Sequence, residues 1–446
     1  MMEQARMKMK WIGVQIGVAW LCIAGGIGTP AVAADDMSSE LRALKERVEA
    51  LERGEKTVDV TEKDGHGHRL HPIHSRGEAE ISGDITMVGQ GVSSDQLADP
   101  TAGTSGDAME GTLSLDLFFE HQVSSRGLVL VHLDVQQGLG LTTIPVFAAP
   151  NGNTTGPNND VESFDDSQIH LDQAYYEHRW LDDRLVLNVG QYDPTMHFDT
   201  NAFANSERSQ FLANLFGNNP TIEFGGTANF YGLGAVVMTK PVEWLDLVAG
   251  VMEGDGDYSE AFARPWSMVE ADLKAAWGER RGTYRVYAWQ NRSHHTADSI
   301  SNLLPGGQDR KNQGIGFNFD QEVTEHVGVW GRYGTQDSRV ASFDRSLTAG
   351  IQLGGGAFGR PHDALGVGYG LTMISDEYEA AQTALGSPEF SGNEGYWEIY
   401  YRYVVDGDAE VHGVSLSPDV QYITNAGGDS SLDPIVVYGL RLQAFF

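Results

Sequence analysis

The sequence predicts an all-β fold, a 16-stranded antiparallel transmembrane β-barrel with a short N-terminal coiled-coil helix. Three observations predict this fold. Apolar and polar residues alternate with a period of two over most of the 446-residue chain, as they do in strands with one apolar face. Sixteen such segments can be counted, and an even number closes an antiparallel barrel with both ends on one side. Short and long connections also take turns between the segments, as in bacterial outer-membrane barrels.

Residues 1–33 have the pattern of a secretory signal peptide. Basic residues at positions 6, 8 and 10 precede the apolar run 11–28, and an A-x-A-type cleavage pattern follows at 31–33. A lipoprotein anchor on Cys22 is the alternative, but large apolar residues stand directly before it, where such a site has small ones. Cys22 is the single cysteine of the sequence, so the exported chain is expected to contain no disulfide.

Residues 34–62 contain a heptad pattern. Apolar side chains recur at alternating spacings of four and three, at Met37, Leu41, Leu44, Val48 and Leu51. This spacing predicts a periplasmic coiled coil. Because so short a coil cannot hold helices together alone, it favours an oligomer whose subunits already lie close together. A single amphipathic helix on the protein's own surface is the alternative.

Residues 63–77 form a histidine-rich linker. The imidazoles lie close together in sequence, at His66, His68, His71 and His74. Such a cluster could bind Zn²⁺, Ni²⁺ or Cu²⁺, since imidazole suits all three ions. A flexible linker between the coiled coil and the barrel explains the same composition. We therefore assign no residue to a metal site.

Residues 78–446 are predicted to form the barrel. In 111–120, Leu113 and its apolar partners share one face, while Ser114 and Asp116 lie on the other. The last strand must pair with the first, because an open sheet edge cannot lie in lipid. The same alternation predicts strands over 79–90, 111–120, 128–137, 168–179, 184–192, 227–239, 244–253, 266–277, 283–292, 313–322, 327–336, 345–354, 364–374, 395–404, 411–423 and 434–446.

A soluble periplasmic β-sandwich is the alternative architecture. It would have to bury all of these apolar strand faces between two sheets. Aromatic residues gather near the predicted strand ends, among them Trp180, Trp244, Trp277, Trp397 and Tyr438. Membrane barrels carry aromatic girdles at such positions, so the membrane barrel is favoured.

Composition and motifs argue against two classes of function. The sequence has 62 acidic and 30 basic residues and a net charge of −32, which repels nucleic acid. It contains no G-x-S-x-G, H-E-x-x-H, phosphate-loop or dinucleotide-binding motif. We therefore expect a protein that is not an enzyme, needs no cofactor and binds no nucleic acid.

Three of the predicted strands turn arginine and aromatic residues toward the inside of the barrel. Sugars present apolar C–H faces that pack on aromatic rings, and hydroxyls that bond to arginine and carboxylate groups. The alternative is that bulky side chains simply narrow the bore, since barrel interiors are polar in any case. The candidates for the pore lining are Arg285, Tyr287, Trp289, Trp330, Arg332, Glu398 and Arg402.

The connection over residues 195–226 is the longest candidate for a segment inside the barrel. A structured loop of this length is typically functional, and we expect it to fold inward and set the constriction. Ser206 is a candidate N-cap for a short amphipathic helix within it. The candidate constriction residues are Asp199, Asn201, Asn205, Glu207 and Arg208.

This connection resembles the carbohydrate-selective porin family, the OprB-type outer-membrane porins. The resemblance covers residues 78–446 and is carried by VGQYDPTMHFDTNAFANSERSQFLANLFGNNPTIEF (189–224) and KPVEWLDLVAGVMEGDG (240–256). The residues that match the family's pattern are Gly190, Asp193, Phe198, Asp199, Asn201, Ala204, Asn205, Glu207, Gln210, Phe211, Leu212, Asn218, Asn219 and Pro220.

The resemblance implies both a location and an activity. It implies a homotrimeric barrel in the lipid of the bacterial outer membrane, which lets carbohydrates and other small hydrophilic solutes diffuse passively. The histidine-rich linker departs from the family's pattern, and the whole chain is acidic. A cation- or metal-chelate-selective channel is therefore the alternative function.

Overall fold

The computed structural model describes residues 79–93, 107–138, 140–141, 144–152, 168–224, 231–256, 258, 262–293, 311–408 and 412–446. The predicted signal peptide (1–33), coiled coil (34–62) and histidine-rich linker (63–77) lie outside these described residues. Within the described ranges, no helix has the length and apolar composition of a helical membrane span.

Sixteen strands form in the described residues, and each overlaps its predicted range. Their alternating sequences favour the extended backbone, in which neighbouring side chains point to opposite faces. The strands are β1 (Ala79–Ser93), β2 (Asp107–Ser124), β3 (Gly127–Gln137), β4 (Gln168–Trp180), β5 (Leu185–Tyr192), β6 (Gly232–Val242), β7 (Leu245–Met252), β8 (Trp266–Trp277), β9 (Arg280–Asn291), β10 (Asn312–Thr324), β11 (Val327–Thr335), β12 (Phe343–Gly354), β13 (Ala364–Ile374), β14 (Glu394–Asp408), β15 (His412–Thr424) and β16 (Ile435–Phe445).

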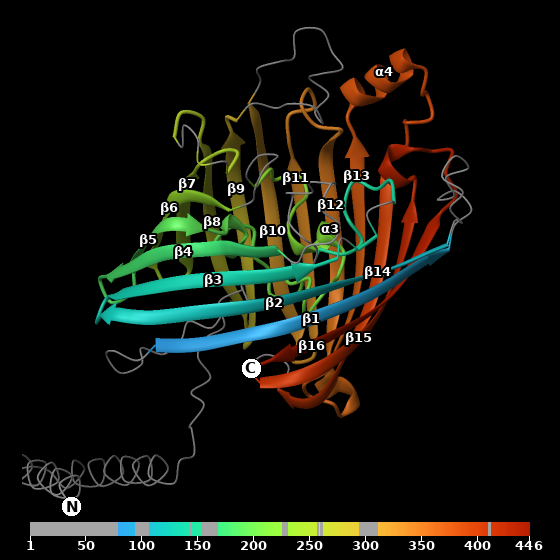
Figure 1. Cartoon of the computed structure of the whole chain (residues 1–446). Helices are drawn as coiled ribbons and strands as arrows, with labels where there is room; N and C mark the ends of the chain where they lie inside the picture. The colour runs from blue at the N-terminus through green and yellow to red at the C-terminus, as the bar shows by residue number, and fades with distance from the viewer. Residues whose placement is uncertain are drawn as a thin grey trace, which may run out of the picture. The chain divides into compact units, whose positions relative to one another are not determined.

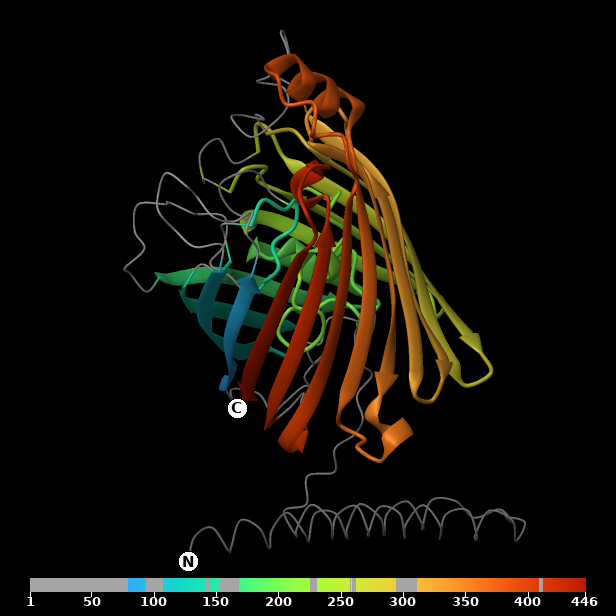
Figure 2. The same cartoon turned by 90° about the vertical axis from the view of Figure 1, so that its right-hand side faces the viewer.

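The strands form one closed antiparallel barrel in which each strand pairs with its neighbours in sequence. β1 closes the barrel by pairing with β16, so that Asp84 lies opposite Phe445 and Gly91 lies opposite Tyr438. Figures 1 and 2 show β1 beside β16, with the chain's C-terminus at the end of β16. The prediction that the last strand pairs with the first is therefore confirmed.

The two faces of the barrel wall differ in polarity. On β16, Tyr438, Leu440 and Leu442 are exposed on the outer face, whereas Arg441 and Gln443 are buried inside. The other strands repeat this alternation, so the outside of the wall is apolar and the inside is largely polar. This is the polarity of a barrel that lipid surrounds.

The connections at the two ends of the barrel differ in length. Tight turns lie at the end that carries the C-terminus, and the helix α4 (Asp376–Leu385) lies at the opposite end (Figure 2). Sequence reasoning treated 375–394 as a long loop and missed α4. Its signals were Ser375, which caps the Tyr378 amide, and Gly386, which ends the helix in a left-handed conformation. Short helical turns are η2 (Pro194–Met196), α3 (Asn214–Gly217), η4 (Gly355–Phe358) and η5 (Ala426–Gly428).

Candidate functional site

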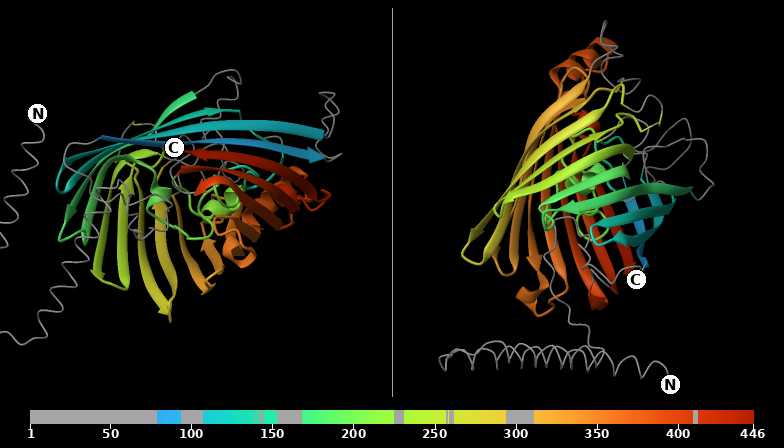
Figure 3. Two further views of the ribbon diagram at one scale, coloured as in Figure 1. Left: turned by 90° about the horizontal axis from the view of Figure 1, so that it is seen from below. Right: turned by 90° about the vertical axis from the view of Figure 1, so that its left-hand side faces the viewer.

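Residues 193–224 leave β5 and fold into the barrel; we call them the inner segment. The view along the barrel in Figure 3 shows α3 within the ring of strands. The segment begins at Asp193, whose carboxylate accepts a hydrogen bond from the Thr195 amide (2.8 Å), with Pro194 at the first position of η2. The local sequence therefore turns the chain sharply at the end of β5.

The helix predicted behind Ser206 forms only in part, although Ser206 does act as its N-cap and accepts a hydrogen bond from the Ser209 amide at its Oγ atom (3.2 Å). One turn forms, in which the Gln210 amide donates to the Ser206 carbonyl (2.8 Å), and a helix follows only at α3. The reason lies in the barrel wall, where Glu398 of β14 accepts from the amides of Leu212 (2.5 Å) and Ala213 (3.0 Å). These amides would otherwise have bonded within a continuous helix.

Arg441 of β16 bonds to the same part of the inner segment from its other side. Its guanidinium donates to the carbonyls of Glu207 (2.6 Å) and Gln210 (2.9 Å). Arg441 and Glu398 therefore satisfy backbone groups of the segment with side chains of the wall.

Arg332 of β11 makes the most extensive contact between wall and inner segment. Its guanidinium donates to the carbonyls of Ala204 (2.6 Å), Phe216 (2.8 Å) and Gly217 (3.1 Å). Its Nε lies 3.0 Å from the Oδ2 atom of Asp199. Both side chains are fully buried, so this charged pair holds the segment where water does not compete.

Asn201 and Asn318 add a polar connection beside this pair. The Asn201 side-chain amide donates to the Asn318 side-chain carbonyl (2.8 Å) and to the Phe319 carbonyl (3.0 Å). The Asn318 amide in turn donates to Oδ1 of Asp199 (2.8 Å). Asp199 and Asn201 are thus buried against β10.

Glycines on the inner wall make room for the inner segment. A Cβ atom at Gly370 of β13 would lie 2.3 Å from Leu215, and one at Gly328 of β11 would lie 2.1 Å from the ring of Phe203. Real Cβ atoms essentially never come so close to a neighbour. Glycine at these positions therefore lets the two side chains lie directly against the wall.

Aromatic side chains pack in the space between wall and segment. Phe211 of the segment lies edge-on to Trp330 (5.3 Å between centroids) and Tyr400 (4.9 Å), and Phe216 lies edge-on to Trp330 (5.7 Å). Rings in this arrangement attract one another beyond their area of burial. The inner segment is therefore packed like a protein core.

The predicted candidates on β9 also lie on the inner face and are buried. The Arg285 guanidinium lies 2.5 Å from the carboxylate of Asp320 on β10. Tyr287 and Trp289 belong to an apolar cluster with Phe198 at the start of the inner segment. Their side chains thus contact the wall and the segment.

A second inward connection, residues 144–152, packs against the inner segment. The Gly152 amide donates to the Leu212 carbonyl (2.7 Å), and the Asn214 amide donates to the Ala149 carbonyl (3.0 Å). Sequence reasoning missed this connection. Its apolar run IPVFAAP (144–150) was the available signal, because an exposed loop has no need of such a run.

The longest continuous stretch of the inner segment that keeps contact with solvent is residues 205–210, which are half-buried, while Ala202 and Asn214 are exposed singly. Arg208 forms ion pairs with Asp116 and, at 3.2 Å, with Asp84 on the opposite wall. Arg402 of β14 is largely buried and donates to the Ser209 carbonyl (3.4 Å). Of the predicted site residues, Asn205, Glu207 and Arg208 therefore remain partly open, and the other nine are buried.

The wall formed by β1 to β4 is acidic on its inner face. Asp84, Asp116, Asp134 and Asp172 are all buried there. Asp84 lies opposite Asp116 in the strand register, and Asp116 lies opposite Asp134. Because like charges directly across two strands repel, this row gives the interior a negative potential.

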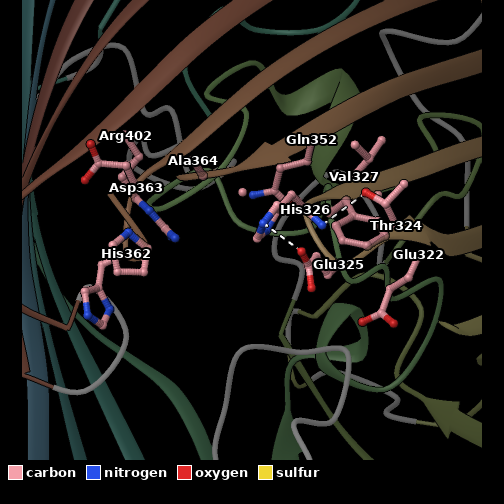
Figure 4. Close-up of a pocket in the computed structure, with 14 residues that line it drawn as sticks. Glu322, Thr324, Glu325, His326, Val327, Gln352, His362, Asp363, Ala364 and Arg402 are labelled. Carbon is pink, nitrogen blue, oxygen red and sulfur yellow. Dashed lines mark hydrogen bonds and ion pairs between the residues drawn. The ribbon is translucent and has the colours of Figure 1, made fainter. Parts of the chain in front are cut away.

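A polar cavity of about 340 Å³ opens at the end with the tight turns. Figure 4 shows His326 and His362 on the turns that border it, with Arg402 on the wall behind. His326 lies 3.2 Å from the carboxylate of Glu325. Phe203 also lines the cavity, which therefore reaches from this mouth to the inner segment.

Burial shifts the pKa values of two groups at the start of the inner segment. It lowers the pKa of the His197 imidazole to about 4. It raises the pKa of the Asp193 carboxyl, and the hydrogen bonds from Thr195 oppose that rise. Burial disfavours the charged form of each group, the imidazolium of His197 and the carboxylate of Asp193. The pKa of the histidine therefore falls and the pKa of the aspartate rises.

Comparisons with known proteins agree with this geometry. The sequence matches the family described as carbohydrate-selective porin, OprB family, over residues 135–446. Porin AaxA of Chlamydia abortus (strain DSM 27085 / S26/3) is 19% identical over 297 residues, which cover 65% of this chain and 60% of that relative. The match thus spans less than two thirds of the relative's length.

The fold is similar to solved structures of outer-membrane channels. The high-pH structure of Pseudomonas putida OprB has a TM-score of 0.67 at 16% identity, and the match covers 82% of this chain and 94% of that one. The outer membrane channel DcaP of Acinetobacter baumannii has a TM-score of 0.50 at 13% identity, with 83% and 98% covered. At these identities the likeness concerns the fold.

Proposed function

Since this chain belongs to the OprB family of carbohydrate-selective porins, channel proteins of the bacterial outer membrane, we propose that carbohydrates and other small hydrophilic solutes cross it passively. The observation that carries this proposal is the fixed inner segment. It is bonded to the wall through Glu398, Arg332 and Arg441, and its longest half-buried stretch is residues 205–210. A segment held in this way narrows the opening to a constant size.

We assign two roles to the twelve candidate residues. Asn205, Glu207 and Arg208 meet the solute, since an amide, a carboxylate and a guanidinium together can bond to both the donor and the acceptor side of a sugar hydroxyl. The buried candidates hold the inner segment in place: Asp199, Asn201, Arg285, Tyr287, Trp289, Trp330, Arg332, Glu398 and Arg402.

An aromatic ring lies close to this polar group. Arg208 pairs with Asp116, whose Oδ1 atom lies 2.6 Å from Nε2 of His132, and that imidazole stacks on Phe118 (4.1 Å between centroids). Sugar C–H faces pack on rings of this kind. The combination favours a carbohydrate over a simple ion as the preferred solute.

A cation-preferring channel is the second candidate. The observation that favours it is the buried row Asp84, Asp116 and Asp134, which Arg208 compensates only in part. A negative interior attracts cations and repels anions. A preference for cations does not prevent uncharged sugars from passing. The two candidates therefore differ in the solute that the channel prefers, a carbohydrate in the first and a cation in the second.

The experiment that tests the proposal is single-channel recording in planar bilayers with maltose or glucose added to one side. We expect the sugar to reduce the ion current and the reduction to weaken in Arg208→Gln. The exposed Arg345→Gln, on an outer position of β12, is the matched control and should behave like the wild type. A strong cation preference without any sugar effect would favour the second candidate.

We also propose a homotrimer whose N-terminal segments, residues 34–62, form a coiled coil. The support is the heptad pattern, which needs subunits that are close together. Native mass spectrometry of the detergent-solubilised protein tests this. A monomer, or a trimer that persists unchanged after deletion of 34–62, would count against the role of the coiled coil.

A further inference from the structure

We propose that Asp116, His132 and Asp172 bind a divalent transition-metal ion on the inner wall of the barrel. This site goes beyond the passage of solutes, because a bound ion would be held by the wall whichever solute the channel admits. The three residues lie on neighbouring strands, β2, β3 and β4. Sequence reasoning could not find them, since they are far apart along the chain and only the strand register brings them together.

The three side chains lie close enough together to reach one ion. Nε2 of His132 lies 2.6 Å from Oδ1 of Asp116, and Nδ1, the other ring nitrogen, lies 3.9 Å from Oδ2 of Asp172. Because an imidazole binds an ion through one nitrogen, an ion at Nε2 needs the Asp172 carboxylate to turn toward it. One ligand atom from each residue lies within 4.8 Å of the others. Ligands of a tetrahedral zinc ion are about 3.4 Å apart, so a side-chain movement on the order of 1 Å completes the site.

The surroundings hold these ligands in place. All three side chains are buried, and the His132 ring stacks on Phe118 with an angle of 11° between the planes. Stacking fixes the plane in which the imidazole presents its nitrogens. Metal ligands that are oriented by their neighbours bind more tightly than free ones.

Asp134 gives a second, independent observation that points to a ligand. It lies two residues after His132 on the same face of β3 and opposite Asp116 in the register, with only 3% of its surface exposed. Its Oδ2 atom accepts from Gln136 (2.5 Å), but its Oδ1 atom has no hydrogen-bond partner among the described residues. A buried carboxylate oxygen without a partner is costly, and a nearby cation would supply one.

The charge of the cluster also calls for a cation. Asp84 and Asp116 share the guanidinium of Arg208. Among the described residues, no arginine or lysine forms an ion pair with Asp134 or Asp172. A divalent ion would therefore reduce a repulsion that the strand register itself imposes.

The ligand types favour one class of ion. Imidazole suits Zn²⁺, Ni²⁺, Cu²⁺ and Fe²⁺, whereas Ca²⁺ and Mg²⁺ prefer a shell of oxygen atoms. A site with one histidine and two aspartates should therefore select a first-row transition metal. The imidazole must bind without its second proton, so binding should weaken as the pH falls.

The test uses the full chain in detergent, freed of metal with a chelator. Because His66, His68, His71 and His74 can themselves bind metal, the background is a variant with all four changed to glutamine. We expect calorimetric titration of this background with Zn²⁺ to show one site, which Ca²⁺ does not fill. Adding His132→Gln or Asp172→Asn should weaken Zn²⁺ binding by at least 100-fold, and Asp134→Asn by roughly tenfold.

A control variant and a spectroscopic measurement test whether Zn²⁺ binds at His132 and not elsewhere. His326→Gln at the mouth is the matched control and should bind Zn²⁺ like the background. X-ray absorption of the Zn²⁺-loaded background should show one imidazole among oxygen ligands, a result that does not depend on the folding of any variant changed at the site itself. The proposal is overturned if the background binds no Zn²⁺, if binding survives His132→Gln unchanged, or if the spectrum shows no imidazole.

Discussion

Nε of Arg332 lies 3.0 Å from Oδ2 of Asp199, and neither side chain has any exposed surface. The pair joins β11 of the wall to the inner segment at a residue whose backbone is left-handed, with φ of 56° at Asp199. A left-handed backbone costs free energy in any residue other than glycine, so the hydrogen bonds and the ion pair of Asp199 must hold it in that conformation. The constriction we propose depends on this contact.

Arg332→Met should release the inner segment. Methionine fills much of the same volume but leaves the Asp199 carboxylate buried without its charged partner, which costs about 3 to 5 kcal/mol. We expect a lower free energy of unfolding in urea, measured by tryptophan fluorescence, and a larger and noisier single-channel conductance. Arg345→Gln breaks an exposed pair with Asp344 and should change the stability by less than about 1 kcal/mol. Equal effects of the two variants would contradict the proposed anchor.

Gly370→Val should push the inner segment away from the wall. The added side chain would occupy the position of Leu215, and overpacking of this kind typically costs about 1 to 3 kcal/mol. A larger conductance is the expected result. Gly89→Val on β1 is the control, since nothing lies within 4 Å of a Cβ atom there. If Gly370→Val conducts like Gly89→Val, the close approach of Leu215 does not set the opening.

The sequence predicted the barrel well because strand faces leave a local signal. Each apolar position on β16, from Tyr438 to Leu442, stands two residues from the next, and closure with β1 follows from the need to avoid an open edge. The inward direction of the loop 195–226 was also correctly predicted for its described residues. Its length and its position after a strand were sufficient for this.

The roles within the site could not be predicted in the same way. Arg332 and Arg208 look alike in the sequence, yet one is buried under the inner segment and the other is half-buried. The helix expected after Ser206 stops after one turn for a related reason. Glu398, almost two hundred residues away, accepts hydrogen bonds from the amides of Leu212 and Ala213. Such outcomes depend on long-range partners that local patterns do not contain.

Neutralising the acidic wall should reduce any preference for cations. A unit charge about 8 Å from the path of an ion changes its energy by about 0.5 kcal/mol in water, or roughly twofold in local concentration. Each substitution should lower the local concentration of cations and raise that of anions by the same factor, so we expect Asp134→Asn with Asp172→Asn to lower the cation-to-anion permeability ratio by roughly 16-fold, measured as the reversal potential in a KCl gradient. Asp376→Asn in α4 serves as the control and should leave the ratio unchanged. A ratio insensitive to the double variant would show that another surface sets selectivity.

His197 should make the stability of the protein depend on pH. Its pKa is about 4 in the fold against about 6.5 when unfolded, so its contribution is complete above pH 6.5 and is lost as the pH falls toward 4. Between pH 7 and pH 4 the free energy of unfolding of the wild type should fall by about 3 kcal/mol more than that of His197→Gln. Urea unfolding at a series of pH values measures this difference. Parallel pH profiles for the two proteins would contradict the burial of a neutral imidazole at this position.

The central claim is that sugars cross this barrel through an opening bordered by residues 205–210. Liposome swelling with sugars of increasing size tests it most directly, using the wild type and Arg332→Met side by side. We predict that monosaccharides enter wild-type liposomes quickly and larger sugars enter slowly, and that Arg332→Met admits the larger sugars faster. Absence of swelling with a correctly folded wild type, or the same size dependence in both proteins, would contradict the claim.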